Sequence, residues 1–136
     1  MSTRKEPRWL TRQHVEAIHD AQLATHGGLG GVRDAGGLEA ALGRAPNRWH
    51  YRQTQKLPEL AAAYGFAITK SHPFNDGNKR TALVAMLTFL EWNGRRFDAD
   101  ESEVVAVMLG VSDGSIPEAD LARWLTENSK ARTRKK

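Results

Sequence analysis

The chain of 136 residues contains no cysteine and no apolar run close to the roughly 20 residues that a membrane-spanning helix needs. The absence of cysteine excludes disulfides, cysteine-ligated zinc, iron–sulfur clusters and thiol catalysis, and it fits a reducing compartment. The first ten residues carry several charges and no apolar run, so the sequence predicts no secretory signal. We therefore expect a cytoplasmic protein that has no membrane partner.

The charge of the chain is unevenly distributed. Twenty basic and 16 acidic residues give a formal net charge of +4, and five of the basic residues lie within residues 129–136. Removing these five positive charges changes the net charge from +4 to −1, so the body is nearly neutral. A nucleic-acid-binding module needs a basic surface, and we therefore expect no direct nucleic-acid partner. We predict one domain over residues 1–128, followed by a disordered basic tail over residues 129–136.

Apolar residues recur mostly at helical spacing, without sustained alternation of period two, so we predict an all-α fold. Thr11 is a typical N-cap, and the helix that it begins should end at Gly27. Six glycines within residues 27–37 predict a mobile loop or a small hairpin. A short helix is predicted over Leu38–Arg44, whereas Ala45–Lys56 shows no clear period and remains unassigned.

The second half of the chain is also helical in pattern. Pro58 suits the first turn of a helix that should end at His72, because Pro73 disfavours helical geometry in the residue before it. Ser115 and Glu118 have the spacing of a capping box for the last helix. The remaining predictions are a central buried helix from Asp76 that stops at Gly94, a short extended piece over Arg95–Asp98, and helices over Glu101–Val111 and Ile116–Asn128.

Most polar residues of interest lie between the two central helices, in the sequence His72-Pro73-Phe74-Asn75-Asp76-Gly77-Asn78-Lys79-Arg80. The N-terminus of a helix presents free backbone N–H groups and the positive end of its dipole, and it therefore attracts phosphates. Gly77 lets a backbone approach closely. Lys79 and Arg80 are unusual in a first helical turn, where cations are disfavoured unless an anion compensates them. The pattern predicts a bound polyphosphate.

Two further residues of this stretch supply chemistry. Asp76 offers the hard oxygen ligand that Mg²⁺ takes from a protein when water and nucleotide phosphates provide the rest. His72 offers a base near neutral pH. A base, a magnesium ligand, an anion site and two cations together indicate phosphoryl or nucleotidyl transfer. A P-loop is excluded because its pattern GxxxxGK[ST] is absent, and the histidines without metal-ligand spacing are interpreted as surface or packing residues: His14, His19, His26 and His50.

The stretch His72–Arg80 resembles the signature of the Fic/Doc family, H-x-F-x-[D/E]-G-N-G-R-x-x-R. The chain departs from it at Lys79, where most Fic proteins have glycine, and at Leu83, where they have the second arginine. Both departures resemble Doc-type (death on curing) toxins, whose motif reads H-x-F-N-x-A-N-K-R, although Gly77 stands where these have alanine. The glycine-rich loop with Asp34–Arg44, and Phe97-Asp98, extend the resemblance over most of the chain.

The resemblance implies an all-α Fic fold, a helical bundle around a central motif helix with a small glycine-rich flap or hairpin. It implies that the protein acts on a protein hydroxyl with ATP and Mg²⁺. Typical Fic enzymes transfer AMP, whereas Doc-type toxins phosphorylate a threonine of elongation factor Tu and stop translation. Lys79 in place of glycine implies a nucleotide bound in reverse, with its γ-phosphate presented for transfer. We therefore expect a protein kinase toxin, with an AMP transferase as the alternative.

Carried over residue by residue, the resemblance implies that His72 is the general base and that Asp76 holds Mg²⁺. Lys70, two residues before the base, is a further predicted phosphate contact. The phosphates would bind the residues that open the motif helix: Gly77, Asn78, Lys79 and Arg80. The expected catalytic residues are His72, Asp76, Lys79 and Arg80.

The family also implies a means of control. The inhibitory string [S/T]-x-x-x-E-[G/N] of many Fic proteins is absent here, so we expect inhibition by a separate Phd-like antitoxin, whose disordered C-terminal segment folds as a helix on the toxin. Two readings outside the enzyme class remain open. One is a degenerate Fic fold that only binds a partner, and the other is a helical nucleic-acid-binding module that uses the basic ends and Arg95-Arg96.

Overall fold

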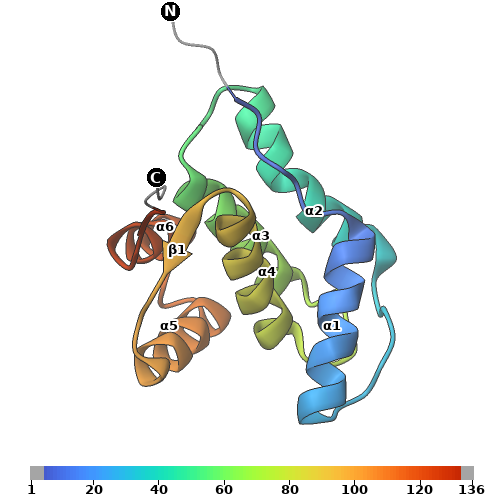
Figure 1. The fold of residues 1–136 in the computed structure, drawn as a ribbon. Helices are drawn as coiled ribbons and strands as arrows, with labels where there is room; N and C mark the ends of the chain where they lie inside the picture. Colours follow the sequence, from blue (N-terminus) through green and yellow to red (C-terminus); the bar gives the residue numbers. More distant parts are fainter. Residues whose placement is uncertain (1–4, 133–136) are drawn as a thin grey trace, which may run out of the picture.

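The computed structural model describes residues 5–132 and confirms the predicted all-α fold (Figure 1). The described part contains two short strands besides its helices, and no helix within it is long and apolar enough to cross a membrane. The elements in chain order are α1 (Arg12–His26), α2 (Ala35–His50), α3 (Leu57–Ser71), α4 (Asn78–Trp92), β1 (Arg95–Phe97), α5 (Glu101–Asp113), α6 (Glu118–Glu127) and β2 (Ser129–Ala131).

Helices α3 and α4 pack against each other at the centre of the bundle (Figure 1). Helix α3 also contacts α2, α5 and α6, whereas α4 also contacts α1, α5 and β1. Gly65 of α3 permits the close approach of the central pair, because a Cβ atom there would lie 2.1 Å from Sδ of Met86 on α4. The two helices that flank the α3–α4 junction are therefore packed directly against each other.

The predicted ends of the first and third helices are confirmed. Thr11 caps α1 and forms a capping box with His14, and Gly27 ends the helix with a φ of 77°. Helix α3 ends before His72, which adopts the left-handed conformation with φ 49° and ψ 58°. Pro73 follows directly, so the chain turns away from α3 at the residue that carries the predicted base.

Helix α2 is longer than the sequence predicted. It extends from Ala35 to His50. The stretch after Ala45, which has no clear period in the sequence, is therefore helical as far as His50, with Pro46 inside the helix. Proline removes one helical hydrogen bond, but the helix continues because one face is buried against the core. Its buried side chains are Leu38, Ala41, Leu42, Ala45 and Trp49.

The predicted disordered tail over residues 129–136 is wrong for its first three residues. Ser129–Ala131 forms β2, which pairs antiparallel with β1, and Arg95 lies opposite Ala131. The Arg95 side chain donates from Nε to Oγ of Ser129 over 2.6 Å, which ties the strand to the extended piece that was predicted correctly. Residues 133–136 lie outside the described residues.

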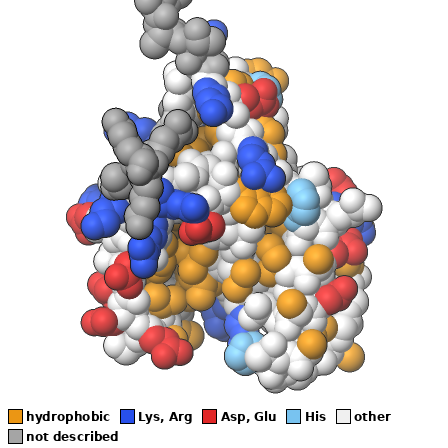
Figure 2. Space-filling view, viewed as in Figure 1, with side chains coloured by type: hydrophobic (Ala, Val, Ile, Leu, Met, Phe, Trp, Pro, Cys, Tyr) orange, Lys and Arg blue, Asp and Glu red, His pale blue; other side chains and the backbone are white. Residues whose placement is uncertain are grey.

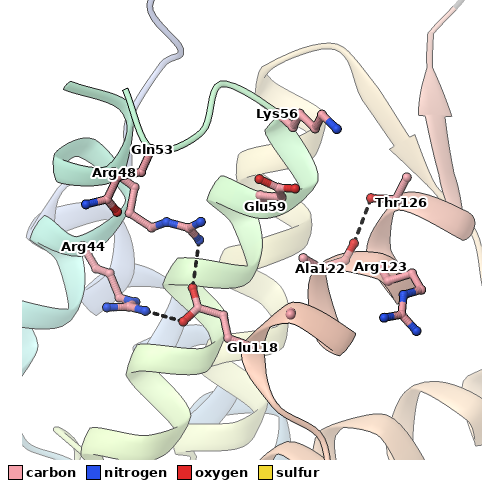
Figure 3. Close-up of a pocket in the computed structure, with 10 residues that line it drawn as sticks. Arg44, Arg48, Gln53, Lys56, Glu59, Glu118, Ala122, Arg123 and Thr126 are labelled. Carbon is pink, nitrogen blue, oxygen red and sulfur yellow. Dashed lines mark hydrogen bonds and ion pairs between the residues drawn. The ribbon is translucent and has the colours of Figure 1, made fainter. Parts of the chain in front are cut away.

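The predicted capping box for the last helix is also wrong. Helix α6 begins after Pro117, and among the residues that the structure describes no side chain caps it. Glu118 instead accepts hydrogen bonds from Arg44 and from Arg48, the latter over 3.1 Å, and so joins α6 to α2 across α3 (Figure 3). The capping box does not form because the helix starts at Glu118 itself, which leaves Ser115 outside the N-cap position, and the Ser115 N–H donates to Oδ1 of Asp113 over 2.9 Å.

Candidate active site

The loop between α3 and α4 brings most of the predicted site residues to one hollow of about 260 Å³. This volume suits the phosphate end of a nucleotide, since complete ligand pockets usually exceed about 300 Å³. The residues that line it are His72, Asn75, Asp76, Gly77, Asn78, Lys79 and Arg80. All the motif residues that the sequence predicted to be catalytic thus lie around one space.

Lys70 does not line this hollow. It lies on the last turn of α3 and borders a different groove, between α2 and α3, together with Arg44 and Phe66. Its ammonium group lies near the end of α5, where hydrogen bonds from Ser115 lower the pKa of Asp113 and the charge of Lys70 adds a smaller contribution. The structure therefore separates Lys70 from the other predicted phosphate contacts.

Asn78 holds both the loop and the predicted base. Its buried amide accepts from the backbone N–H of Phe74 and donates to the carbonyl of Phe74, each over 3.0 Å. The same Nδ2 lies 3.3 Å from Nδ1 of His72. Because the two bonds to Phe74 fix Nδ2 as a donor, Nδ1 accepts, and the neutral ring carries its hydrogen on Nε2. Proton abstraction at Nε2 therefore requires the other tautomer and the loss of this contact.

The carboxylate of Asp76 is exposed and bound by backbone amides. Gly77 donates to Oδ1 over 2.8 Å, and Leu29 donates to Oδ2 over 3.3 Å. The bond from Gly77, then that from Leu29, and the nearby charge of Arg80 lower the pKa of Asp76. Asp76 is therefore an anion at neutral pH.

The donor set fits magnesium. Each oxygen of Asp76 accepts one of these hydrogen bonds and retains a further lone pair, and Mg²⁺ usually binds one or two carboxylates together with water and phosphates. Within residues 5–132 no group of three or more His, Cys, Asp or Glu side chains could enclose a metal ion. A metal here would thus depend on a nucleotide for most of its ligands.

The N-terminus of α4 provides the positive side of the hollow. Gly77 has a φ of 75° and precedes the helix, whose first backbone bond is from Thr81 N–H to the Gly77 carbonyl over 3.0 Å. The first turn of α4 contains no acidic residue, whereas Lys79 and Arg80 are exposed beside it. Free backbone N–H groups and two cations therefore point to an anionic ligand.

The glycine-rich segment lies against this loop. It forms an antiparallel bridge between Val32 and Phe74, in which Asn75 N–H donates to Gly31 over 3.1 Å and Arg33 N–H donates to Pro73 over 2.7 Å. The predicted flap of residues 27–37 ends early, because α2 already begins at Ala35. The flap makes no hairpin with itself, and its bridge partner is the loop between α3 and α4.

Three residues that support the loop were missed as functional residues. The guanidinium of Arg33 donates to the carbonyls of Ser71 and His72, and Asn75 Nδ2 donates to Gly30 over 2.9 Å. His19 was interpreted as a surface or packing residue, and it is packed, but its Nε2 also lies 2.8 Å from the Asp76 carbonyl. The sequence holds no signal for His19, because its partner is 57 positions away.

A hollow of about 640 Å³ between α2, α3 and α6 is larger than the candidate site (Figure 3). Its lining includes Arg44 and Arg48, both engaged by Glu118, and Glu59, which accepts from Thr54. It contains neither a histidine base nor an aspartate. The junction of α3 and α4 is therefore the better candidate for catalysis, although its hollow is smaller.

Comparison with known proteins agrees with the motif. A model of the Fic/DOC family matches residues 9–90. The chain is 37% identical to the protein kinase doc of Escherichia phage P1 over 118 residues, which cover 87% of this chain and 93% of that protein. It is 41% identical to the toxin Doc of Mycolicibacterium smegmatis over 94 residues, 65% of this chain and 72% of that protein.

Proposed function

The chain belongs to the Fic/DOC family, and on this basis we propose that it is a Doc-type toxin that transfers the γ-phosphate of ATP to a protein hydroxyl. The observation that carries the proposal is the single hollow at the start of α4, around which His72, Asp76, Lys79 and Arg80 lie together. The relative named a protein kinase, which this chain matches over most of its length, supports phosphoryl transfer in particular.

The proposed reaction divides the work among these residues. The first turn of α4 and the side chains of Lys79 and Arg80 bind the phosphates, which orients the γ-phosphorus and stabilises its charge. His72, in the tautomer that carries its hydrogen on Nδ1, takes the proton of the attacking hydroxyl at Nε2. A new bond forms from that oxygen to the γ-phosphorus, and the bond to the β-phosphate oxygen breaks to release ADP. Asp76 would hold Mg²⁺, which neutralises phosphate charge when bound.

Lys79 is the proposed reason for phosphorylation rather than AMP transfer. A lysine side chain occupies space at the start of α4 that the glycine of most Fic proteins leaves open, and its charge suits a terminal phosphate. We propose a threonine of elongation factor Tu as the target and inhibition of translation in the cytoplasm as the consequence. This target follows from the family resemblance.

An antitoxin of the Phd type is the proposed partner. A groove of about 440 Å³ lies along α4 and β1, lined by the apolar residues Val84, Leu87, Trp92 and Phe97 and by the polar residues Thr88 and Glu91. Figure 2 shows hydrophobic side chains exposed in the strip between α5 and α1. An amphipathic helix is the common occupant of such a groove. We expect Leu87→Arg to abolish inhibition by a co-expressed Phd-type antitoxin and to preserve toxicity, whereas the exposed Val105→Arg on α5 should leave inhibition intact.

Paired labelling tests the proposed reaction. The purified protein is incubated with Mg²⁺, a translation extract and ATP labelled at either the γ- or the α-phosphate. Label from the γ-phosphate alone on a band of the size of elongation factor Tu is expected, and His72→Ala should abolish it, whereas His50→Ala at an exposed position should not. Label from the α-phosphate would identify an AMP transferase. No label from either would favour a protein that only binds.

A further inference from the structure

His19 of α1 lies beneath the catalytic loop, where it is almost completely buried at 2% exposure. Its ring stacks on Phe74 with centroids 3.9 Å apart and planes inclined by 10°. Its Nε2 lies 2.8 Å from the backbone carbonyl oxygen of Asp76. Since a carbonyl can only accept, Nε2 carries a hydrogen and donates it.

The contacted carbonyl belongs to the peptide group that joins Asp76 to Gly77. This group is planar, so its C=O and its N–H point in fixed, opposite directions. The N–H end donates to Oδ1 of Asp76 over 2.8 Å. A hydrogen bond that fixes the Asp76 carbonyl therefore also fixes the direction in which the Gly77 N–H points toward the Asp76 carboxylate.

Gly77 makes such a bond necessary. It adopts a φ of 75°, and without a Cβ atom it meets little steric resistance to rotation of the preceding peptide plane. The flap holds the carboxylate from the other side through the longer 3.3 Å contact from Leu29. Of these contacts, the one from His19 comes from the interior of the bundle, on a side chain that packing on Phe74 already fixes.

We propose that His19 is a positioning residue, which donates to the Asp76 carbonyl and thereby orients the carboxylate that binds the metal. The proposal rests on the proposed function of Asp76 as the magnesium ligand. Two properties of the histidine have a role in this proposal: the flat ring fills the space against Phe74, and the Nε2 hydrogen fixes the peptide plane. Neither phenylalanine nor glutamine supplies both.

The test separates these two properties. His19→Phe keeps a ring and removes the donor, whereas His19→Gln keeps a donor near the Nε2 position and removes the ring. His26→Phe, at an exposed position at the end of the same helix, is the matched control. Binding of Mn²⁺ with ADP is measured by electron paramagnetic resonance, and hydrogen exchange of the Gly77 amide is followed on the metal-free proteins. Thermal unfolding verifies that each variant folds.

We expect His19→Phe to weaken Mn²⁺–ADP binding by about tenfold or more, the usual effect of removing a group that orients a metal ligand. Exchange of the Gly77 amide should accelerate by a similar factor. His19→Gln and His26→Phe should remain close to the unmodified protein in both measurements. If His19→Phe does not fold, His19→Met replaces it, because methionine is similar in shape to glutamine but lacks the donor.

Two results would overturn the proposal. One is unchanged binding and exchange in the variant without a donor, and the other is an equal loss in His19→Gln, which would reduce the role of His19 to packing. A protein that binds Mn²⁺–ADP but transfers no phosphate would refute the proposed function alone. If the unmodified protein binds no Mn²⁺–ADP, the exchange of Gly77 in the same variants still decides whether His19 fixes the peptide plane.

Discussion

Glu118 at the start of α6 should contribute more to stability than an ordinary surface acid. Its side chain is 15% exposed and binds Arg44 and Arg48, whose side chains are 47% and 25% exposed. The variant Glu118→Gln removes the charge that lies between two cations and leaves these cations facing each other. Figure 3 shows that both arginines come from α2, so the change also loosens the connection between α2 and α6.

The expected loss lies between two limits. Exposed ion pairs contribute about 0.2–1 kcal/mol, whereas breaking a fully buried pair costs about 3–5 kcal/mol. The pair with Arg48 is mostly buried and that with Arg44 is half exposed, so we expect a loss of about 2 kcal/mol in the free energy of unfolding. With an unfolding entropy of about 2.1 cal/mol/K per residue over 136 residues, Tm should fall by about 7 °C.

The assay is thermal unfolding at low salt, with Asp120→Asn as the control. Asp120 lies in the same first turn of α6 and binds Arg123 over 3.3 Å, but both side chains are well exposed. The loss of stability in Asp120→Asn measures the effect of removing an acidic charge near the helix N-terminus, about 0.3–1 kcal/mol. The extra loss in Glu118→Gln should shrink as salt screens the charges. Equal Tm shifts in the two variants would refute the reasoning.

Three further predictions concern the flap, Asp76 and the central helices. Gly28→Ala should weaken Mn²⁺–ADP binding more than Gly27→Ala. Both positions have positive φ, but only a Cβ atom at Gly28 would meet Oδ2 of Asp76, at 2.8 Å. Equal effects of the two variants would show that this contact is unimportant. Because the pKa of Asp76 is lower in the folded protein than its unfolded value of about 3.9, the ionised carboxylate stabilises the fold above that value, and this contribution is lost as pH falls through the folded pKa. Urea unfolding should therefore show Asp76→Asn to be less stable than the unmodified protein at pH 6 and equally stable at the acid end. Gly65→Ala should cost about 1–3 kcal/mol in urea unfolding despite the better helix propensity of alanine, since its Cβ would lie 2.1 Å from Sδ of Met86, and a gain in stability would contradict this packing.

Much of the architecture could be predicted from local signals. Thr11 and Gly27 mark the ends of α1 because caps act on neighbouring backbone groups. Pro73 fixes the end of α3 at His72, and the motif places its polar residues at the start of α4. Each of these features depends on residues within a few positions of one another, and such features are readable from sequence order alone.

Where local and distant partners compete, the sequence predicted the wrong outcome. Glu118 has the spacing of a capping box, yet it binds two arginines about 70 positions earlier in the chain. The stretch from Ala45 to Lys56 shows no clear period in the sequence and stays unassigned there, yet burial of one face of α2 continues the helix through Pro46 to His50. Ser129–Ala131 has the composition of a tail and becomes a strand because Arg95–Phe97 offers it a partner.

The sequence by itself determined which residues could carry the chemistry, since the motif holds His72, Asp76, Lys79 and Arg80 within nine positions. Only the tertiary structure decided how they are held. The flap bridges Phe74 from one side, and His19 reaches the Asp76 carbonyl across 57 positions of sequence. These contacts arise when α1 and the flap pack against the loop, and no periodicity or cap along the chain encodes that packing.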